Sequence, residues 1–184
     1  FLHERVSAFL MFTGRHDRFQ GLAFRLNVDP GFAFYILNKK ANTLWAEAGY
    51  DFQYDRRTNL ALDENAAAVA ANMDAIMEAE MNGETPPEPL AVLDPVFSNH
   101  AYRLFLGYSN RMTETISFDT GVEWLHSFVD PAIYRLNWDN NLTVSLAKRF
   151  SLGLTFTLRY ENKPLPTVRP LDTITSVNLI YRFI

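Results

Sequence analysis

Apolar and polar positions alternate along this chain in eight separate segments. Segment 152–161 shows the alternation most cleanly, with Leu154 and Phe156 on one face and threonine, arginine and glutamate on the other. A period of two is typical of a β-strand whose faces meet different surroundings. The predicted strands cover residues 5–14, 22–36, 43–54, 100–109, 114–126, 134–147, 152–161 and 173–183. We expect a β-bulge at Pro30, because proline has no N–H for the ladder.

The predicted strands are long, and their connections alternate in length. A tilted membrane crossing needs about 9–11 residues, whereas strands of soluble proteins average about 5–6. The short connections lie at 38–42, 110–113 and 148–150, and the longer ones at 14–19, 55–99, 127–132 and 162–171. Outer-membrane barrels have short periplasmic turns and long external loops. The pattern predicts an all-β fold, an antiparallel up-and-down transmembrane β-barrel of about eight strands, located in the bacterial outer membrane with lipid around it.

The last predicted strand reaches the end of the chain. Its apolar positions finish with Tyr181 and Phe183, and Ile184 follows them. A terminal strand of this kind resembles the assembly signal that the barrel-insertion machinery reads. We therefore expect that machinery to be a partner during assembly, with Tyr181 and Phe183 as the signal.

Residues 58–98 break the β pattern. Asp63–Asn82 is rich in Ala, Met and Glu and predicts a helix of about five turns, with Asp63 as N-cap and Gly83 just past the end. The 58–98 segment contains eight acidic residues and no Lys or Arg. We expect an external insertion in the single domain 1–184, with its helix on the rim or across the mouth of the barrel. Residues predicted to share one apolar face of the helix are Val69, Met73, Ile76 and Met77.

That insertion has two interpretations. It could bind a cation or a basic protein partner, because its charge is of one sign. It could equally be a solvated loop helix, acidic on one side and packed on the rim through Val69, Met73 and Ile76. No calcium-loop spacing occurs in it.

Composition narrows the chemistry further. The chain has no cysteine and a mean hydropathy of -0.12, and no apolar run approaches the 20 or so residues of a membrane-spanning helix. No basic stripe with interleaved aromatics is present, so nucleic acid is not an expected partner. We expect no metal and no cofactor. The chain begins at Phe1 without a visible signal peptide, as expected of a processed protein or a part of a longer one.

Charged residues on the polar faces of the strands are the first candidate site. As lumen-facing charges they would either line a path for ions and small solutes or pair with one another and fill the interior. An eight-stranded barrel has just enough room for side chains, and the lumen widens with more strands. The candidates are Arg25, Asp29, Glu47, Asp51, Arg103, Asp119, Glu123, Arg135, Asp139, Arg159, Glu161 and Arg182.

Catalytic arrangements are weakly supported. His126 and Ser127 are adjacent, which places them on opposite faces of a strand and works against a direct hydrogen bond. Asp139 and Glu123 could form a carboxylate pair, but nearby arginines favour ion pairing. We therefore expect no enzyme activity. Aromatics near the strand ends and on the apolar face fit an interfacial girdle instead: Tyr102, Tyr108, Trp124, Trp138, Tyr160, Tyr181 and Phe183.

Several motifs at strand–loop corners carry a family resemblance. They are residues 14–19 (GRHDRF) with Gly21-Leu22, residues 48–50 (AGY) with 54–57 (YDRR), and residues 158–164 (LRYENKP) leading to Asp172-Thr173. With them the chain resembles the family of salt-induced outer-membrane proteins, a domain family of unassigned function. The resemblance covers most of the chain, but the acidic segment 60–97 departs from the family's shorter loop. It implies further strands upstream of Phe1 and a barrel of more than eight strands, and it supplies no catalytic or ligand residues.

Three classes of function follow from these patterns. The first is an outer-membrane β-barrel with a structural, protein-interaction or narrow-pore role. The second is a soluble lipocalin-like ligand-binding barrel, which would turn its apolar face inward and its charges outward. The third is an outer-membrane lipid hydrolase. Strand length, the alternation of loop lengths and the aromatic terminal strand favour the first.

Overall fold

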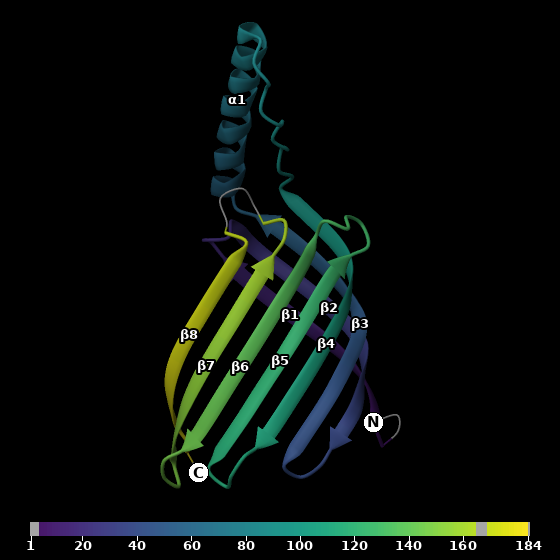
Figure 1. Ribbon diagram of the computed structural model, residues 1–184, viewed down its shortest axis with the longest axis vertical. Coiled ribbons are helices and arrows are strands. Elements are labelled where there is room, and N and C mark those ends of the chain that lie inside the picture. Colours follow the sequence, from purple (N-terminus) through teal and green to yellow (C-terminus); the bar gives the residue numbers. More distant parts are fainter. Residues whose placement is uncertain (1–3, 165–168, 184) are drawn as a thin grey trace.

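The computed structural model describes residues 4–164 and 169–183, and it consists of one curled antiparallel sheet and one helix (Figure 1). The elements are β1 (Val6–Asp17), β2 (Leu22–Asn38), β3 (Asn42–Arg57), α1 (Asn59–Asn82), β4 (Val96–Arg111), β5 (Ile116–Ser127), β6 (Tyr134–Ser145), β7 (Phe150–Glu161) and β8 (Leu171–Tyr181). Each strand pairs with the next one in the chain, in the order β1 to β8. The predicted all-β, antiparallel, up-and-down fold with one helical insertion is confirmed.

The sheet is strongly curved but is not closed by hydrogen bonds among the described residues. Arg135 on β6 reaches Asp51 on β3 across two intervening strands, which requires the sheet to fold around the side chains between them. Pairing runs from β1–β2 to β7–β8, and the described residues include no β1–β8 pair. The outer edges of β1 and β8 are therefore both open.

The two ends of the sheet differ (Figure 1). The end that we call the turn end has the connections 39–41, 112–115 and 146–149. The opposite end, the arm end, has the connections 18–21, 58–95, 128–133 and 162–170, of which 165–168 lie outside the described residues, as does Ile184. The predicted placement of the short turns at one end and the long insertion at the other is confirmed, but connection 18–21, which was expected to be long, has the same four residues as 112–115 and 146–149.

β4 begins earlier than its sequence pattern predicts. Val96 and Phe97 pair with Arg56 and Asp55 of β3, so both strands continue beyond the expected ends. The predicted insertion 58–98 therefore includes the first residues of a strand. The segment outside the sheet is 58–95.

The predicted bulge at Pro30 is wrong. Pairing of β2 with β3 passes from Val28–Phe52 to Gly31–Gly49 without a change of register, and the irregularities lie instead near the two ends of β2. The backbones approach closely at this point, because a Cβ added to Gly49 would lie 2.6 Å from the Pro30 carbonyl oxygen. Glycine accommodates the proline here by allowing close contact, so no extra residue is needed.

Helix α1 begins before the predicted N-cap. Thr58 is extended, and its side chain accepts a hydrogen bond from the Ala61 N–H at 3.2 Å. Because threonine caps well and Asn59–Leu62 are compatible with a helix, Asp63 lies inside the first turns and the predicted Asp63 cap is wrong. Gly83 has a φ of 70° and ends the helix as predicted.

The helix stands out from the arm end, and the chain returns alongside it (Figure 1). We call α1 together with residues 84–95 the arm, and 84–95 the strap. Asn72 and Asn65, two turns apart, each accept a hydrogen bond from a strap N–H and donate one to a strap carbonyl. The helix therefore packs against its own return segment, and the predicted packing of Met73 on the rim is wrong, since Met73 is 58% exposed. Within the described residues, no helix has both the length and the apolar character of a membrane span.

Candidate functional site: the charged inner face and the mouth cavity

The concave side of the sheet, the inner face, is polar. Odd-numbered positions of β2 to β7 point to it, and they include eleven of the twelve candidate charges. Arg182 is the exception, because it follows the end of β8 and is exposed. Asp51 is the most deeply buried of the set, with 1% of its surface exposed. Water is largely excluded from this face between β2 and β4, so its charges need partners.

Arg25 and Asp55 form a two-pronged ion pair. The Arg25 Nε and Nη2 atoms donate to the two carboxylate oxygens of Asp55 at 2.7 and 2.6 Å. Gln53 donates a further hydrogen bond to Asp55 at 2.8 Å. Both charged residues are buried, and this fork-to-fork geometry is the most favourable one for arginine and carboxylate.

Arg103 joins three strands. From β4 it donates to Glu47 on β3 and to Glu123 on β5, each at 2.6 Å. Its guanidinium also lies 5.5 Å from the ring centroid of Phe9 and 5.4 Å from that of Phe105. This places the cation between two carboxylates and two aromatic faces.

Asp51 is the centre of a second group. It accepts a hydrogen bond from Asn27 at 2.6 Å and a long one from Arg135 at 3.4 Å. Asp29 lies near it in β2, and the Oδ1 atom of Asp29 is buried without a hydrogen-bond partner. Arg135 is thus less completely paired than Arg25 or Arg103, although it is also withdrawn from water.

Charges on β5 to β7 are more exposed. Asp139 pairs with Arg159 at 2.9 Å and also accepts from Thr157, while Asp119 accepts from Ser109 at 2.6 Å. The structure therefore brings most candidates into ion pairs, but it separates them into a buried half on β2–β4 and a wetter half toward β7.

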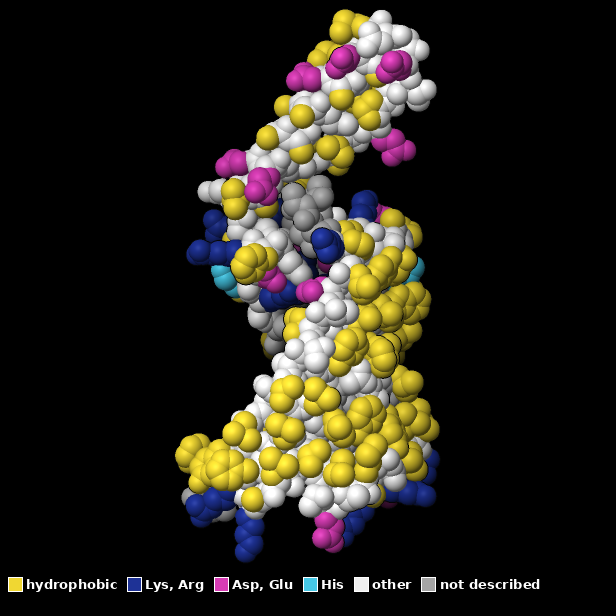
Figure 2. Space-filling model, turned by 60° about the vertical axis from the view of Figure 1, so that its left-hand side comes forward, with side chains coloured by type: hydrophobic (Ala, Val, Ile, Leu, Met, Phe, Trp, Pro, Cys, Tyr) yellow, Lys and Arg dark blue, Asp and Glu magenta, His cyan; other side chains and the backbone are white. Residues whose placement is uncertain are grey.

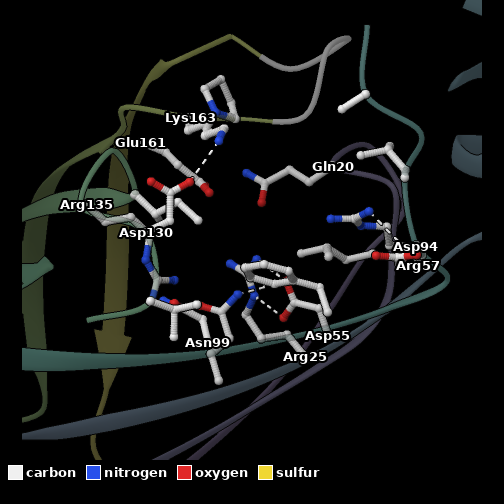
Figure 3. Close-up of a pocket in the computed structure, with 18 of the residues that line it drawn as sticks. Gln20, Arg25, Asp55, Arg57, Asp94, Asn99, Asp130, Arg135, Glu161 and Lys163 are labelled. Carbon is white, nitrogen blue, oxygen red and sulfur yellow. Dashed lines mark hydrogen bonds and ion pairs between the residues drawn. The ribbon is translucent and has the colours of Figure 1, made fainter. Parts of the chain in front are cut away.

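A cavity of about 420 Å³ opens at the arm end above the Arg25–Asp55 pair. Figure 3 shows side chains from several strands and loops pointing into it, among them Gln20, Arg135 and Glu161. Among the described residues that line it, cationic and acidic side chains are equal in number. They are Arg25, Arg57, Arg135 and Lys163, and Asp55, Asp94, Asp130 and Glu161. The cavity can hold water or a small polar solute of mixed charge.

One wall of this cavity is fixed by an ion pair between two connections. Lys163 donates to Asp130 at 2.8 Å, and the Ala132 N–H donates to the same carboxylate at 2.9 Å. The Lys163 hydrogen bond is the main cause that lowers the pKa of Asp130 from its ordinary value of 3.8. The mouth of the sheet is therefore shaped by charge as well as by the strands.

The considered catalytic pairs are not formed. Ser127 Oγ donates to Asn99 at 2.5 Å and accepts the N–H groups of Val129 and Asp130. His126 contacts the Tyr102 hydroxyl through Nδ1 and the Pro131 carbonyl through Nε2. Asp139 and Glu123 do not pair with each other. Glu123 binds Arg103 instead, and Asp139 binds Arg159. Among the described residues, no group of three or more His, Asp or Glu is placed to hold a metal ion.

The convex side of the sheet, the outer face, is apolar and bordered by aromatic rings. Leucine, valine, isoleucine and phenylalanine are exposed along most strands, and Figure 2 shows them covering the wall of the sheet. Near the arm end, Tyr102 contacts the rings of Trp124, His126 and Phe128. Near the turn end, Tyr181 contacts Phe150 and Phe183.

Sequence reasoning missed several inner-face residues. Asp55 falls in the predicted connection 55–99, although it continues the odd-numbered alternation of Glu47 and Asp51. Uncharged partners were also missed, such as Asn27, Gln53 and Asn99, because an amide on a strand gives no signal of its own. Alternation marks their face, and only the strand register identifies their partners.

The fold and this site define a class of protein, an all-β chain with one curled antiparallel sheet, a charged inner face and an apolar outer face. More particularly, the chain belongs to the family described as protein of unknown function, DUF481, which matches residues 1–183. The expected membership of a domain family of unassigned function is confirmed, and the match includes the acidic insertion. Comparison of the chain with curated proteins and with solved structures gave no match.

Proposed function

We propose that this protein is a non-catalytic β-barrel of the bacterial outer membrane with a structural role. One observation carries the proposal, the inverted polarity of the sheet. The charges that are buried, such as Arg25 and Asp51, lie on the inner face, while large apolar side chains are exposed on the outer face. A soluble barrel that binds an apolar ligand has the opposite arrangement, so the lipocalin-like alternative is not favoured.

The height of the apolar band supports a membrane location. On β7 the aromatic residues Phe150 and Tyr160 lie at the two ends of a run of outward leucines and phenylalanine. Ten residue steps of about 3.3 Å, on a strand tilted by about 40°, span roughly 25 Å. This equals the height of the apolar band of outer-membrane barrels, which is bordered by aromatic girdles at both interfaces.

The open edges bear on the same proposal. In lipid, backbone N–H and C=O groups have no water to bind, so an unpaired strand edge is costly. β1 and β8 each present such an edge in the described residues. We therefore propose that the edges are paired in the membrane-inserted protein, which gives the closed barrel.

The inner face favours a structural role over an open pore. Arg103 links β3, β4 and β5, and the Arg135–Asp51 contact links β6 to β3 across the interior. These pairs occupy the space between facing strands and leave the cavity at the arm end. We propose that the interior is filled on the β2–β6 side, and that solutes reach the mouth cavity from outside.

A pair of substitutions on adjacent residues tests the proposal. Phe156 points outward beside Trp138, and Thr157 points inward and binds Asp139. Phe156→Arg places a charge in lipid near the midplane and is expected to lower the free energy of unfolding in phosphatidylcholine vesicles by about 2–4 kcal/mol. Thr157→Arg, facing the wet part of the interior, serves as the matched control and is expected to fold normally. If Phe156→Arg folded like the wild type while Thr157→Arg failed, the faces would be reversed and the membrane assignment wrong.

A further inference from the structure

The arm presents its helix as a fixed element. Asn72 accepts from the Leu90 N–H at 2.9 Å and donates to the Glu88 carbonyl at 3.2 Å. Asn65 does the same with Leu93 and Ala91, at 2.8 and 3.2 Å. Four hydrogen bonds thus attach one side of α1 to the strap. The rest of the helix surface has no such cover.

One stripe of that uncovered surface is an apolar seam. Its members follow one another at intervals of four, three, four and four residues, and they are Ala66, Ala70, Met73, Met77 and Met81. All five are exposed, the methionines by 58%, 52% and 80%. Spacing by three and four residues forms the stripe along which one helix packs on another. Methionine side chains are flexible and adapt to different partner surfaces.

The seam is surrounded by charge of one sign. Acidic residues flank it, among them Asp63, Asp74 and Glu78, and segment 58–98 holds eight acids and no base. The negative end of the helix dipole adds to this field near Glu78 and Glu80. No basic residue in the last turn offsets it. Figure 2 shows the acidic side chains spread over the arm.

We propose that the exposed face of α1 binds a basic amphipathic helix of a partner protein. An apolar stripe on that helix would cover the alanine and methionine seam, and flanking Lys or Arg side chains would meet the acids. A second copy of the arm fits poorly, since it would bring eight more acids to the contact. An anionic bilayer surface fits poorly for the same reason. The proposal does not depend on the membrane location of the sheet.

A synthetic peptide tests the proposal directly. The probe is a fluorescein-labelled helix of Lys, Ala and Leu with one leucine seam, and a scrambled peptide of the same composition is the reference. The full chain is titrated in buffer or in phosphatidylcholine nanodiscs, whichever keeps it monodisperse, with empty nanodiscs as the blank. We expect fluorescence anisotropy to show tighter binding of the seamed peptide, and weaker binding at high salt, where charges are screened beyond a few ångströms.

Two variant pairs separate the seam from charge alone. The double substitution Met73→Gln/Met77→Gln keeps good helix formers but removes apolar contact, and is expected to weaken binding by about tenfold or more. Met112→Gln, at a methionine 56% exposed at the turn end, is the control and should change nothing. Asp74→Asn/Glu78→Gln should weaken binding, whereas Glu114→Gln at the turn end should not.

Protection of the Leu90 amide from hydrogen exchange shows that the arm stays folded in each variant. Equal binding of the scrambled peptide, or unchanged binding by the methionine variant, would overturn the proposal. Self-association of the wild-type chain that is lost in the methionine variant would also overturn it, in favour of a second copy. None of these results depends on whether the sheet enters lipid.

Discussion

Buried charge in this protein is neutralised across neighbouring strands. Arg25 reaches Asp55 on the adjacent strand, and Arg103 reaches carboxylates on both of its neighbours. Each guanidinium is held by short hydrogen bonds as well as by charge, which is the condition under which an ion pair can be buried at all. Removing one partner of such a pair should therefore cost far more than removing an exposed one.

Asp55→Asn is the residue-scale test of this pairing. It leaves the Arg25 guanidinium buried without its counter-charge, and is expected to lower the free energy of unfolding by about 3–5 kcal/mol. Asp139→Asn disrupts a pair whose side chains are 38% and 55% exposed, and should cost less than about 1 kcal/mol. Urea unfolding followed by tryptophan fluorescence measures both. Similar losses for the two variants would mean that the β2–β3 pair is not shielded from water.

The Asp130–Lys163 pair predicts a dependence on pH. The pKa of Asp130 is lowered in the folded protein by the Lys163 hydrogen bond, so the folded state binds this proton less readily than the unfolded state does. The contribution to stability is present above the ordinary carboxyl pKa of 3.8 and is lost as pH falls through the lower folded value. An NMR titration of the Asp130 carboxyl carbon should show its midpoint rise in Lys163→Gln. An unchanged midpoint would show that the pair does not form.

At the residue scale, sequence predicts the face of a side chain better than its partner. The odd-numbered alternation places Asp51 and Arg135 on the same face, but their contact spans β3 to β6 and depends on the curvature of the sheet. Asn65 gives no signal at all, because its importance comes from a strap residue far along the chain. Face follows from local alternation, whereas partner choice follows from register and shape.

The sequence pattern locates the strands and the helix, but it misplaces several of their ends. β4 starts four residues early because Val96 to Asn99 pair with the extended end of β3, a gain that no local pattern reveals. The helix begins at Asn59 because Thr58 caps it. Asp63 is an equally good cap residue by type, so the residue type alone does not decide between the two positions. Ends of elements are decided by competition between equally plausible local signals.

The strap predicts a measurable effect at the scale of the element. Asn72→Ala removes the acceptor of the Leu90 N–H and the donor to Glu88. Each hydrogen bond contributes about 0.5–1.5 kcal/mol, so hydrogen exchange at the Leu90 amide should accelerate by about 2- to 13-fold per bond lost. Asn82→Ala, in the last turn of the same helix, is the control and should leave Leu90 unchanged. Equal protection in Asn72→Ala would show that the strap is held by other contacts.

As a whole, the molecule has two unlike ends joined by an apolar wall. The arm end carries the acidic arm and the mouth cavity, while connections at the turn end hold basic residues such as Lys39, Lys40 and Lys148 (Figure 2). The alternation of strand faces predicts the apolar wall, and the loop lengths predict that the acidic insertion lies at the end opposite the short turns; the mouth cavity and the basic turn end were not predicted. The sequence pattern does not predict whether β1 and β8 pair with each other, because alternation shows which face a side chain lies on and not which strand an edge pairs with.

We propose that the outer face contacts lipid and that the inner face does not. Two of the three tryptophans report on this. Trp138 points outward on β6, whereas Trp45 points inward, where its Nε1–H donates to Glu47 at 2.9 Å. Chains with a single tryptophan, made by replacing the others with Phe, are reconstituted in phosphatidylcholine vesicles with brominated acyl chains, which quench tryptophan on contact.

We expect strong quenching of the chain that retains Trp138 and little quenching of the chain that retains Trp45. Vesicles without bromine give the unquenched reference for each. Strong quenching of Trp45 with little quenching of Trp138 would reverse the two faces. Failure of either chain to enter the vesicles, with both tryptophans unquenched, would contradict a place for this sheet in the membrane.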